Sequence, residues 1–348
     1  MRPKLTEIVI DGFSKESSVI SDLKKQMESS NINILLGAGF SYPVSGLLKN
    51  YEIEMAKAVE SENKDDLYKV QKDFFDKVIL PFKDDVKVQN GEKSRIAFIS
   101  LIGGIIKNRD SALLHKIVNI FTTNYDLLIE MALEKSKLEY IDGFSGKLCP
   151  KFSTENYGRI ISKQTSVSGK TSELVTFNLY KVHGSLNWRY ENNEIIHNAH
   201  IATINELEKV KEDKKQFIED YGKKLAIINP TKEKLNTTVL NNNHYDQLRM
   251  FCNELEKNNT ILISFGFSFE DEHIQRMTLR ALNSNPTLTL IIFSYDEKST
   301  KKFEKIFEKF NNVNIVQAVK SENETDKNTY FSLDNVNKIF AEIYNGIK

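Results

Sequence analysis

Seven short apolar runs are the feature that most limits what this chain can fold into. Longer segments with helical patterning separate these runs, and such alternation is typical of βαβ units, whose strands lie parallel in one sheet. The sequence therefore predicts an α/β fold in which helices flank a parallel sheet. The predicted strands span residues 33–36, 118–122, 177–182, 226–228, 261–265, 288–293 and 314–317.

The segments between the strands predict helices and two insertions. Residues 204–224 are highly charged and predict a solvated helix, while residues 138–173, rich in Ser, Thr, Lys and Gly, predict irregular structure that forms a flap. We expect a helical lead-in over residues 1–30. A single domain then spans residues 31–348, with a helical and irregular insertion module at about 50–110 and 138–175. Further helices are expected over residues 51–82, 94–107, 272–282, 298–310 and 334–344.

Charge and cysteine content exclude several classes of protein. The 48 basic residues balance 48 acidic ones, so no direct nucleic-acid binding is expected, and the lysines of residues 209–224 alternate with acidic residues. The two cysteines, Cys149 and Cys252, form no CxxC pair, so neither a metal site nor a disulfide framework is predicted. Residues 1–13 lack the pattern of a signal peptide, and no apolar run is long enough for a membrane span. We therefore expect a cytoplasmic protein without membrane contact.

Small and polar residues follow five of the predicted strands. Ligands of open α/β sheets bind beyond the carboxyl ends of the strands, so these residues are the candidate site. The first strand continues into Gly37-Ala38-Gly39-Phe40-Ser41, where glycines allow a sharp turn and close approach to a pyrophosphate, as in a Rossmann-like fold. The third glycine of the dinucleotide fingerprint is absent. A plain tight turn, with Ser41 as a helix cap, is the alternative.

The next two strands end in residues suited to catalysis. Asn124 and Asp126 follow the strand at 118–122, and both can turn into the cleft, although either could instead cap the following helix. His183 follows the strand at 177–182 and precedes a glycine, a position suited to a general base. The other five histidines lie in helical or loop patterns and are expected to be structural or solvent-facing.

Two later strands end in residues that could hold a nucleotide. Gly266 and Ser268 offer close backbone approach and a hydroxyl group, while Ser294 and Tyr295 follow the strand at 288–293. Such folds often hold an adenosine at the latter position. The segment after residue 228 could be a ligand loop, but a turn is the simpler interpretation.

The sequences GAGFS, TTNYD, HGS and SFGFSFEDEHI occur in the order of the signature motifs of the sirtuin superfamily. Over roughly residues 31–295 the chain more closely resembles the sirtuin-like NADases of bacterial antiphage defence. The resemblance implies that Asn124 and His183 are catalytic and that Asp126 lies near the nicotinamide amide. It also implies that a set of loop residues binds the dinucleotide. These are Gly37, Ala38, Gly39, Ser41, Gly266 and Ser268, with Ser294 and Tyr295 placed at the adenosine ribose by position only.

Three departures from protein-deacylating sirtuins bear on the reaction. The chain cannot form their four-cysteine zinc ribbon, has Thr123 where they usually carry glutamine, and lacks their Pro-Asp-Phe-Arg run after the glycine loop. These losses put acyl-lysine chemistry in doubt and leave the glycosidic-bond residues in place.

The resemblance therefore implies an NAD glycohydrolase that uses NAD as its substrate and needs no metal. A zinc-free deacylase or ADP-ribosyltransferase and a non-catalytic NAD or ADP-ribose sensor are the alternatives. NAD depletion in antiphage defence is the implied role. The implied assembly is a homo-oligomer, with a partner ATPase of the HerA type or another sensor protein.

Overall fold

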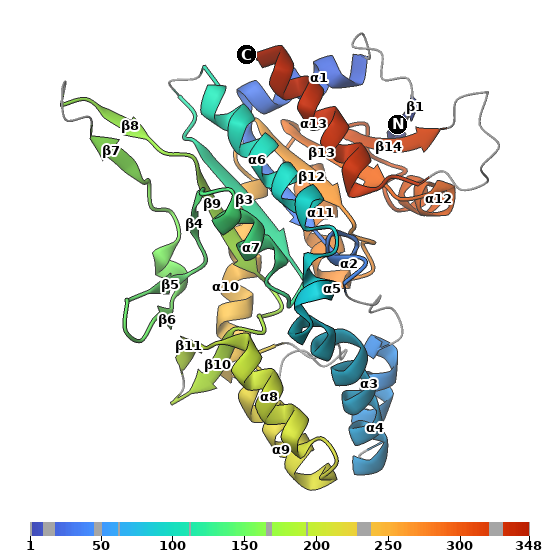
Figure 1. Ribbon diagram of the computed structural model, residues 1–348. Coiled ribbons are helices and arrows are strands. Elements are labelled where there is room, and N and C mark those ends of the chain that lie inside the picture. The colour runs from blue at the N-terminus through green and yellow to red at the C-terminus, as the bar shows by residue number, and fades with distance from the viewer. Residues whose placement is uncertain are drawn as a thin grey trace.

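The computed structural model describes residues 2–9, 18–44, 51–61, 63–110, 113–164, 169–192, 194–227, 238–319 and 330–347. Its centre is an eight-stranded sheet in which every adjacent pair of strands is parallel (Figure 1). The fold is thus the predicted Rossmann-like sheet flanked by helices. In spatial order the strands are β1 (Lys4–Val9), β14 (Val313–Val319), β13 (Leu288–Ser294), β12 (Thr260–Phe265), β2 (Asn31–Leu36), β3 (Ile117–Thr122), β9 (Thr176–Lys181) and β4 (Glu139–Ile141).

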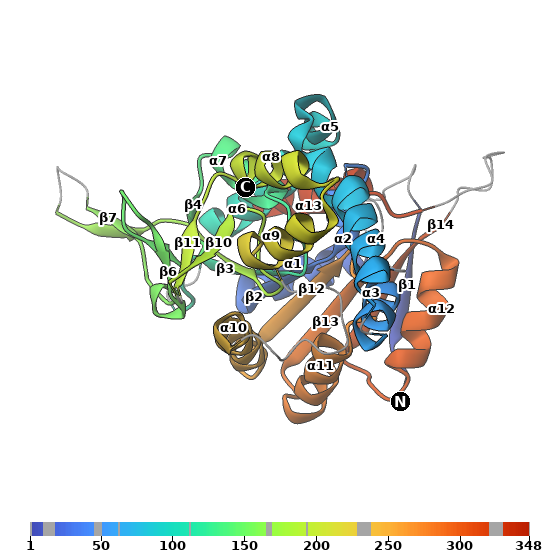
Figure 2. The same ribbon diagram turned by 90° about the horizontal axis from the view of Figure 1, so that it is seen from below.

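Alternating side chains of each central strand enter two separate cores. In β2, Ile32, Ile34 and Leu36 pack on one face, whereas Leu35 packs on the other. Such strands are buried on both sides, which explains their nearly continuous apolar sequences. Figures 1 and 2 show the helices in two layers. The first face is covered by α1 (Ser18–Ser29), α6 (Glu92–Asn108), α7 (Leu128–Lys135) and α13 (Leu333–Ile347), the second by α10 (Thr238–Leu255), α11 (Glu272–Ser284) and α12 (Glu297–Ile306).

Three asparagines form a ladder across the middle of the sheet. Asn33, Asn119 and Asn178 stand opposite one another in β2, β3 and β9. The Asn119 amide donates to Asn33 Oδ1 at 2.9 Å, and the Asn178 amide donates to Asn119 Oδ1 at 2.9 Å. Asn119 also donates to Glu254 Oε2 of α10 at 3.0 Å. Because these bonds form only in this register, the ladder fixes how the three strands align.

A helical module with its own hydrophobic core lies beyond the carboxyl ends of the strands (Figure 1). We call this group of elements the edge module. Phe74, Phe75 and Phe217 are fully buried within it, and Tyr125 and Leu186 join its core from the loops after β3 and β9. Its helices are α3 (Tyr51–Glu60), α4 (Lys64–Phe74), the π-helical turn η1 (Phe75–Ile79), the 3-10 turn η2 (Leu80–Lys83), α5 (Asp85–Gln89), α8 (His200–Val210) and α9 (Lys214–Lys224).

Small antiparallel sheets form from the second insertion together with the segment after β9. They contain β5 (Phe144–Ser145), β6 (Lys151–Phe152), β10 (Trp188–Glu191) and β11 (Glu194–His197) in one sheet and β7 (Ser162–Gln164) and β8 (Thr171–Glu173) in another. A 3-10 turn, η3 (Thr154–Asn156), follows β6. The irregular flap predicted over residues 138–173 is therefore partly wrong. Its first strand, β4, even joins the main sheet, and the short strands escaped prediction because two or three residues carry no periodicity.

Two further expectations need correction. Residues 1–30 are not simply helical, since β1 pairs in parallel with β14 and α1 follows only at residue 18. The segment at 204–224 forms two helices rather than one solvated helix. Its apolar residues recur at helical spacing and are buried in the edge module, while the charges face outward; Ile204, Leu207, Phe217 and Tyr221 are at most 1% exposed.

The strand predicted at 226–228 is also wrong. Ala226 and Ile227 are buried, but only an isolated bridge joins Ile227 to Gly184, and neither residue enters the main sheet. Ile227 packs in the edge module core. An apolar run shows burial without showing strand pairing, which explains the error. Residue 228 and the turn predicted at 229–231 lie outside the described residues.

Candidate active site

The candidate residues gather at one edge of the main sheet. Strands β13, β12, β2, β3 and β9 are consecutive neighbours and point the same way, so the loops after their carboxyl ends lie side by side. The chain order runs in opposite directions on the two sides of the β2–β12 boundary. Such a switch point is where open α/β sheets bind ligands.

Three glycines interlock at this switch point. The Gly37 amide donates to Phe265 O at 3.2 Å, and the Gly39 amide donates to Gly266 O at 3.0 Å. A Cβ atom on Gly39 would lie 2.6 Å from Gly266 Cα, and one on Gly37 would lie 2.5 Å from Gly266 O. Gly266 itself has φ of +66°, which favours glycine. The glycines thus permit two loops to touch through their backbones, which no other residue type allows.

Asn124, Ser41 and Asp126 form a buried polar chain beside Gly37. The Asn124 amide donates to Gly37 O at 2.9 Å and to Ser41 Oγ at 2.8 Å. The Ser41 hydroxyl donates to Asp126 Oδ2 at 2.5 Å. The other Asp126 oxygen accepts from the Leu128 amide at 3.0 Å, so Asp126 both lines the candidate site and contacts the first residue of α7. Ser41 ends the short helix α2 (Ala38–Ser41) and is therefore no N-cap.

Sequence reasoning missed a buried ion pair beneath this chain. Lys181, the last residue of β9, is 1% exposed; its Nζ donates to the Asp126 carbonyl and lies 3.3 Å from Glu130 Oε1. Burial raises the pKa of Glu130 to about 6, against the opposing effect of Lys181. The available signal was a lysine at the end of an otherwise apolar strand.

His183 lies in a second buried cluster at the same edge. Its Nε2 is 3.1 Å from Asp271 Oδ2, and its ring neighbours are Tyr125 and His244, at centroid distances of 6.4 Å and 5.8 Å. His244 Nδ1 contacts the carbonyl of Val182. Sequence reasoning assigned no site role to Asp271 or His244. The signal for Asp271 was its place in SFGFSFEDEHI, a motif from which only the glycine and the first serine after it were chosen.

The remaining candidates differ in their exposure. Ser268 is exposed beside Gly266. Ser294 is fully buried, accepting from the Thr300 hydroxyl at 2.8 Å and donating to Asp296 O at 3.2 Å. Tyr295 is 53% exposed and stacks on Tyr330 at 5.3 Å. Of the last pair, Tyr295 therefore offers an accessible surface, and Ser294 supports the start of α12.

The cavity at Asn124 is small because the edge module covers it. Asn124, Tyr125 and Asp126 line it from the sheet side, while Val78 and Phe82 line it from η1 and η2. Its volume of about 20 Å³ is enough for roughly one water molecule. A dinucleotide can enter only if these side chains move.

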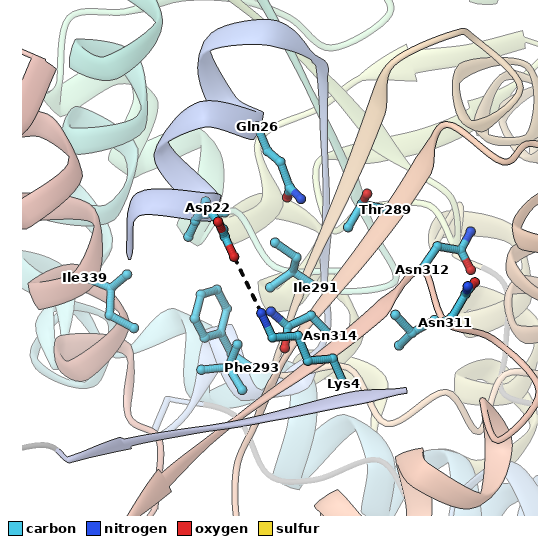
Figure 3. A pocket seen from close by; sticks show the side chains of 13 residues that line it. Lys4, Asp22, Gln26, Thr289, Ile291, Phe293, Asn311, Asn312, Asn314 and Ile339 are labelled. Atoms are coloured by element: carbon cyan, nitrogen blue, oxygen red, sulfur yellow. Dashed lines mark hydrogen bonds and ion pairs between the residues drawn. The ribbon is translucent and has the colours of Figure 1, made fainter. Parts of the chain in front are cut away.

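A larger cavity, of about 180 Å³, lies toward the opposite, amino edge of the sheet (Figure 3). Gln26 of α1 lines it, and Lys4 of β1 pairs with Asp22 of α1 at 3.5 Å beside it. No residue predicted for the site lines this cavity.

Within the described residues, no group of three or more His, Cys, Asp or Glu side chains is placed to hold a metal ion. Cys149 and Cys252 are both unpaired. None of the described helices has the length and apolar character that a membrane span requires.

The fold is an α/β fold with a parallel sheet, and the candidate loops lie at the edge where such folds bind ligands. A family model described as "SIR2-like domain" matches residues 118–315, more than half of the chain. The chain belongs to this family. A SIR2-like domain suggests an NAD-dependent activity in general.

Two further comparisons add little to this assignment. Among solved structures, one described as "Structural Basis for the Mechanism and Regulation of Sir2 Enzymes" is similar, covering 93% of this chain and 96% of that chain with 12% identity and a TM-score of 0.43. A search of curated proteins found no match.

Proposed function

We propose that this protein is an NAD glycohydrolase, which cleaves the bond between nicotinamide and ribose to give nicotinamide and ADP-ribose. One observation carries the proposal. Asn124 and His183 follow adjacent parallel strands at the switch-point edge, beside the interlocked glycines, in a chain of the SIR2-like family. This arrangement supports a site that holds a dinucleotide and acts on its ribose.

The proposed reaction requires few catalytic groups from the protein. Nicotinamide leaves as a neutral base from a cationic ring, so no general acid is required, and the transition state resembles an oxocarbenium ion. The Asn124 amide hydrogens are held by Gly37 O and Ser41 Oγ, which fixes the direction of Oδ1. Asn124 Oδ1 then accepts a hydrogen bond from a water molecule or ribose hydroxyl, while His183 takes up the proton as the general base.

The other loop residues are proposed to hold the dinucleotide. Asp126 lies close to Asn124 and would bind the nicotinamide amide. The adenosine would lie near Ser294 and Tyr295, with the exposed tyrosine ring making the contact. The pyrophosphate would lie along the glycine loops, which comprise Gly37, Ala38, Gly39 and Ser41 on one side and Gly266 and Ser268 on the other.

The wider role rests on the resemblance alone. We propose NAD depletion in antiphage defence, carried out by a homo-oligomer that a HerA-type ATPase or another sensor protein controls. Light scattering of the purified protein, with and without such an ATPase, tests this assembly. A monomer under both conditions would contradict it.

The enzymatic proposal is tested by incubating the purified protein with NAD alone and separating the products. Nicotinamide and ADP-ribose should form in equal amounts. Asn124→Ala and His183→Ala should each abolish their formation, whereas the exposed Asn311→Ala and His273→Ala should keep it.

Two results would overturn the proposal. NAD consumption that requires an acyl-peptide or protein acceptor would indicate a deacylase or ADP-ribosyltransferase. Nucleotide binding without consumption would indicate a sensor.

A further inference from the structure

We propose that Asp271 is the positioning residue for His183, and that its two carboxylate oxygens have different tasks. Oδ1 accepts from the amides of His273 and Ile274, at 3.0 Å and 3.2 Å, and thereby caps α11. Oδ2 lies 3.1 Å from His183 Nε2. The proposal rests on the proposed function, because it assigns a role to Asp271 in the same reaction.

Helix capping explains the contacts of only one of the two carboxylate oxygens of Asp271. An N-cap needs one oxygen acceptor, which Ser, Thr or Asn supplies as well as Asp. Asp213 illustrates the simple case, since it caps α9 by accepting from the Gln216 amide. At Asp271 the second oxygen instead meets an imidazole, and both side chains are only 7% exposed. Burial of two ionisable groups is unfavourable unless they pair. Because the helix cap does not need the second oxygen, its buried contact with His183 requires a separate explanation.

The place of the pair in the fold connects it with the candidate site. Asp271 follows β12, His183 follows β9, and the strands β2 and β3 lie between them. The pair therefore joins the segment after β12 to the segment after β9, and the strand that leads to Asn124 lies between these two strands. Because Asp271 is fixed at the start of a thirteen-residue helix, it holds the imidazole against a rigid element.

A carboxylate at Nε2 has two chemical effects on His183. It accepts the Nε2 hydrogen, so the neutral ring carries its lone pair on Nδ1, and the imidazole is held in one tautomer and one orientation. It also stabilises the imidazolium that forms when the ring accepts a proton. These are the two tasks of the aspartate in a Ser-His-Asp triad, performed here for a base that acts on water or a ribose hydroxyl.

Other titratable groups also face His183. Tyr125 belongs to the loop after β3, whereas His244 belongs to α10 and would repel an imidazolium if it were charged. His244 Nδ1 contacts the Val182 carbonyl, which can only accept, so this nitrogen carries hydrogen. Among the contacts between described residues, Asp271 supplies the carboxylate that touches the ring of His183.

The test is Asp271→Asn, which keeps an oxygen for the helix cap and the shape of the side chain but removes the charge. We expect the kcat of nicotinamide release to fall by roughly 10²- to 10⁴-fold with little change in KM. The limb of the pH profile that His183 produces should move to lower pH, because the imidazolium loses its stabilising partner. The matched control, Asp213→Asn, replaces an equivalent cap and should leave kcat and the pH profile unchanged.

A second measurement works without turnover. Histidine labelled with ¹³C at Cε1 should give at most six side-chain signals, and His183→Ala identifies the one of interest. Asp271→Asn and Asp271→Ser, both of which retain a cap, should lower the pKa of His183 relative to the parent protein.

Unchanged kcat and an unchanged His183 titration in Asp271→Asn would overturn the role of Asp271. A parent protein that releases no nicotinamide would instead remove the proposed function, whereas the titration would still report whether the pair forms.

Discussion

The buried carboxyl group of Glu130 should make the stability of the folded protein depend on pH. Burial raises its folded-state pKa from the ordinary 4.5 to about 6, so the folded protein holds this proton more tightly than the unfolded chain does. The resulting stabilisation is fully present below about pH 4.5 and is lost as the pH rises through 6. The shift corresponds to about 2 kcal/mol.

Urea unfolding of the parent protein and Glu130→Gln at pH 4.5 and 7.5 checks this prediction. The difference in unfolding free energy between the two proteins should change by about 2 kcal/mol across that range, with the parent losing more stability at the higher pH. A difference that is the same at both pH values would show that Glu130 does not titrate as described.

Gly39 and Gly222 should respond in opposite ways to replacement by alanine. A Cβ atom on Gly39 would lie 2.6 Å from the backbone of Gly266, whereas nothing lies within 4 Å of one on Gly222 in α9. Gly39→Ala should therefore push the two loops apart, lower the melting temperature and reduce NAD turnover. Gly222→Ala should stabilise its helix by roughly 0.5–1 kcal/mol. Equal melting temperatures of the two variants would contradict the interlocked loops.

At the scale of single residues, the sequence identified candidate residues by their position after a strand. It did not identify the side chains that contact them. Asn124 and His183 were predicted because a strand precedes each one, and both lie at the predicted edge. Asp271 and the Lys181–Glu130 pair were missed because each depends on a contact between distant segments. Strand periodicity contains no information about such contacts.

The asparagine ladder makes a prediction at the scale of the sheet. Asn119→Ala would remove the central member and take bonds from Asn33, Asn178 and Glu254. Buried polar groups without partners cost about 1–3 kcal/mol each, so the unfolding free energy should fall by at least this amount. Asn258→Ala, at an exposed position between α10 and β12, is the control. Equal stability of both variants would show that the ladder contributes nothing.

Among the strands, the sequence-based prediction succeeded where a strand is buried on both faces and failed elsewhere. The runs at 33–36, 118–122, 177–182, 261–265, 288–293 and 314–317 all lie in strands of the main sheet, apart from residue 182, which directly follows β9. β1 was missed because the edge strand KLTEIV carries polar residues. Ala226 and Ile227 are apolar because they are buried, Ala226 in the core of one sheet face and Ile227 in the edge module, and only the tertiary structure distinguishes such burial from strand pairing.

For the whole molecule, the relation between the sheet and the edge module decides access to Asn124. Phe82 is 6% exposed and lines the 20 Å³ cavity from the module side. Phe82→Ala should enlarge that cavity and spare the nucleotide the cost of displacing the ring, so ADP-ribose should bind several-fold more tightly. Calorimetric titration gives the dissociation constant.

Phe307→Ala is the control for Phe82→Ala, because Phe307 is also a buried phenylalanine but packs in the core on the α12 side. It should leave the affinity unchanged. Weaker or unchanged binding by a folded Phe82→Ala would show that this ring does not obstruct the site.

The central claim is that the loops after β12, β2, β3 and β9 hold one dinucleotide. A crystal structure of His183→Ala with NAD tests it most directly, because the variant should bind the substrate without cleaving it. We predict the nicotinamide ribose beside Asn124 and the pyrophosphate along Gly37, Gly39 and Gly266. NAD bound in the cavity at the amino edge, or with its nicotinamide ribose remote from Asn124, would contradict the claim.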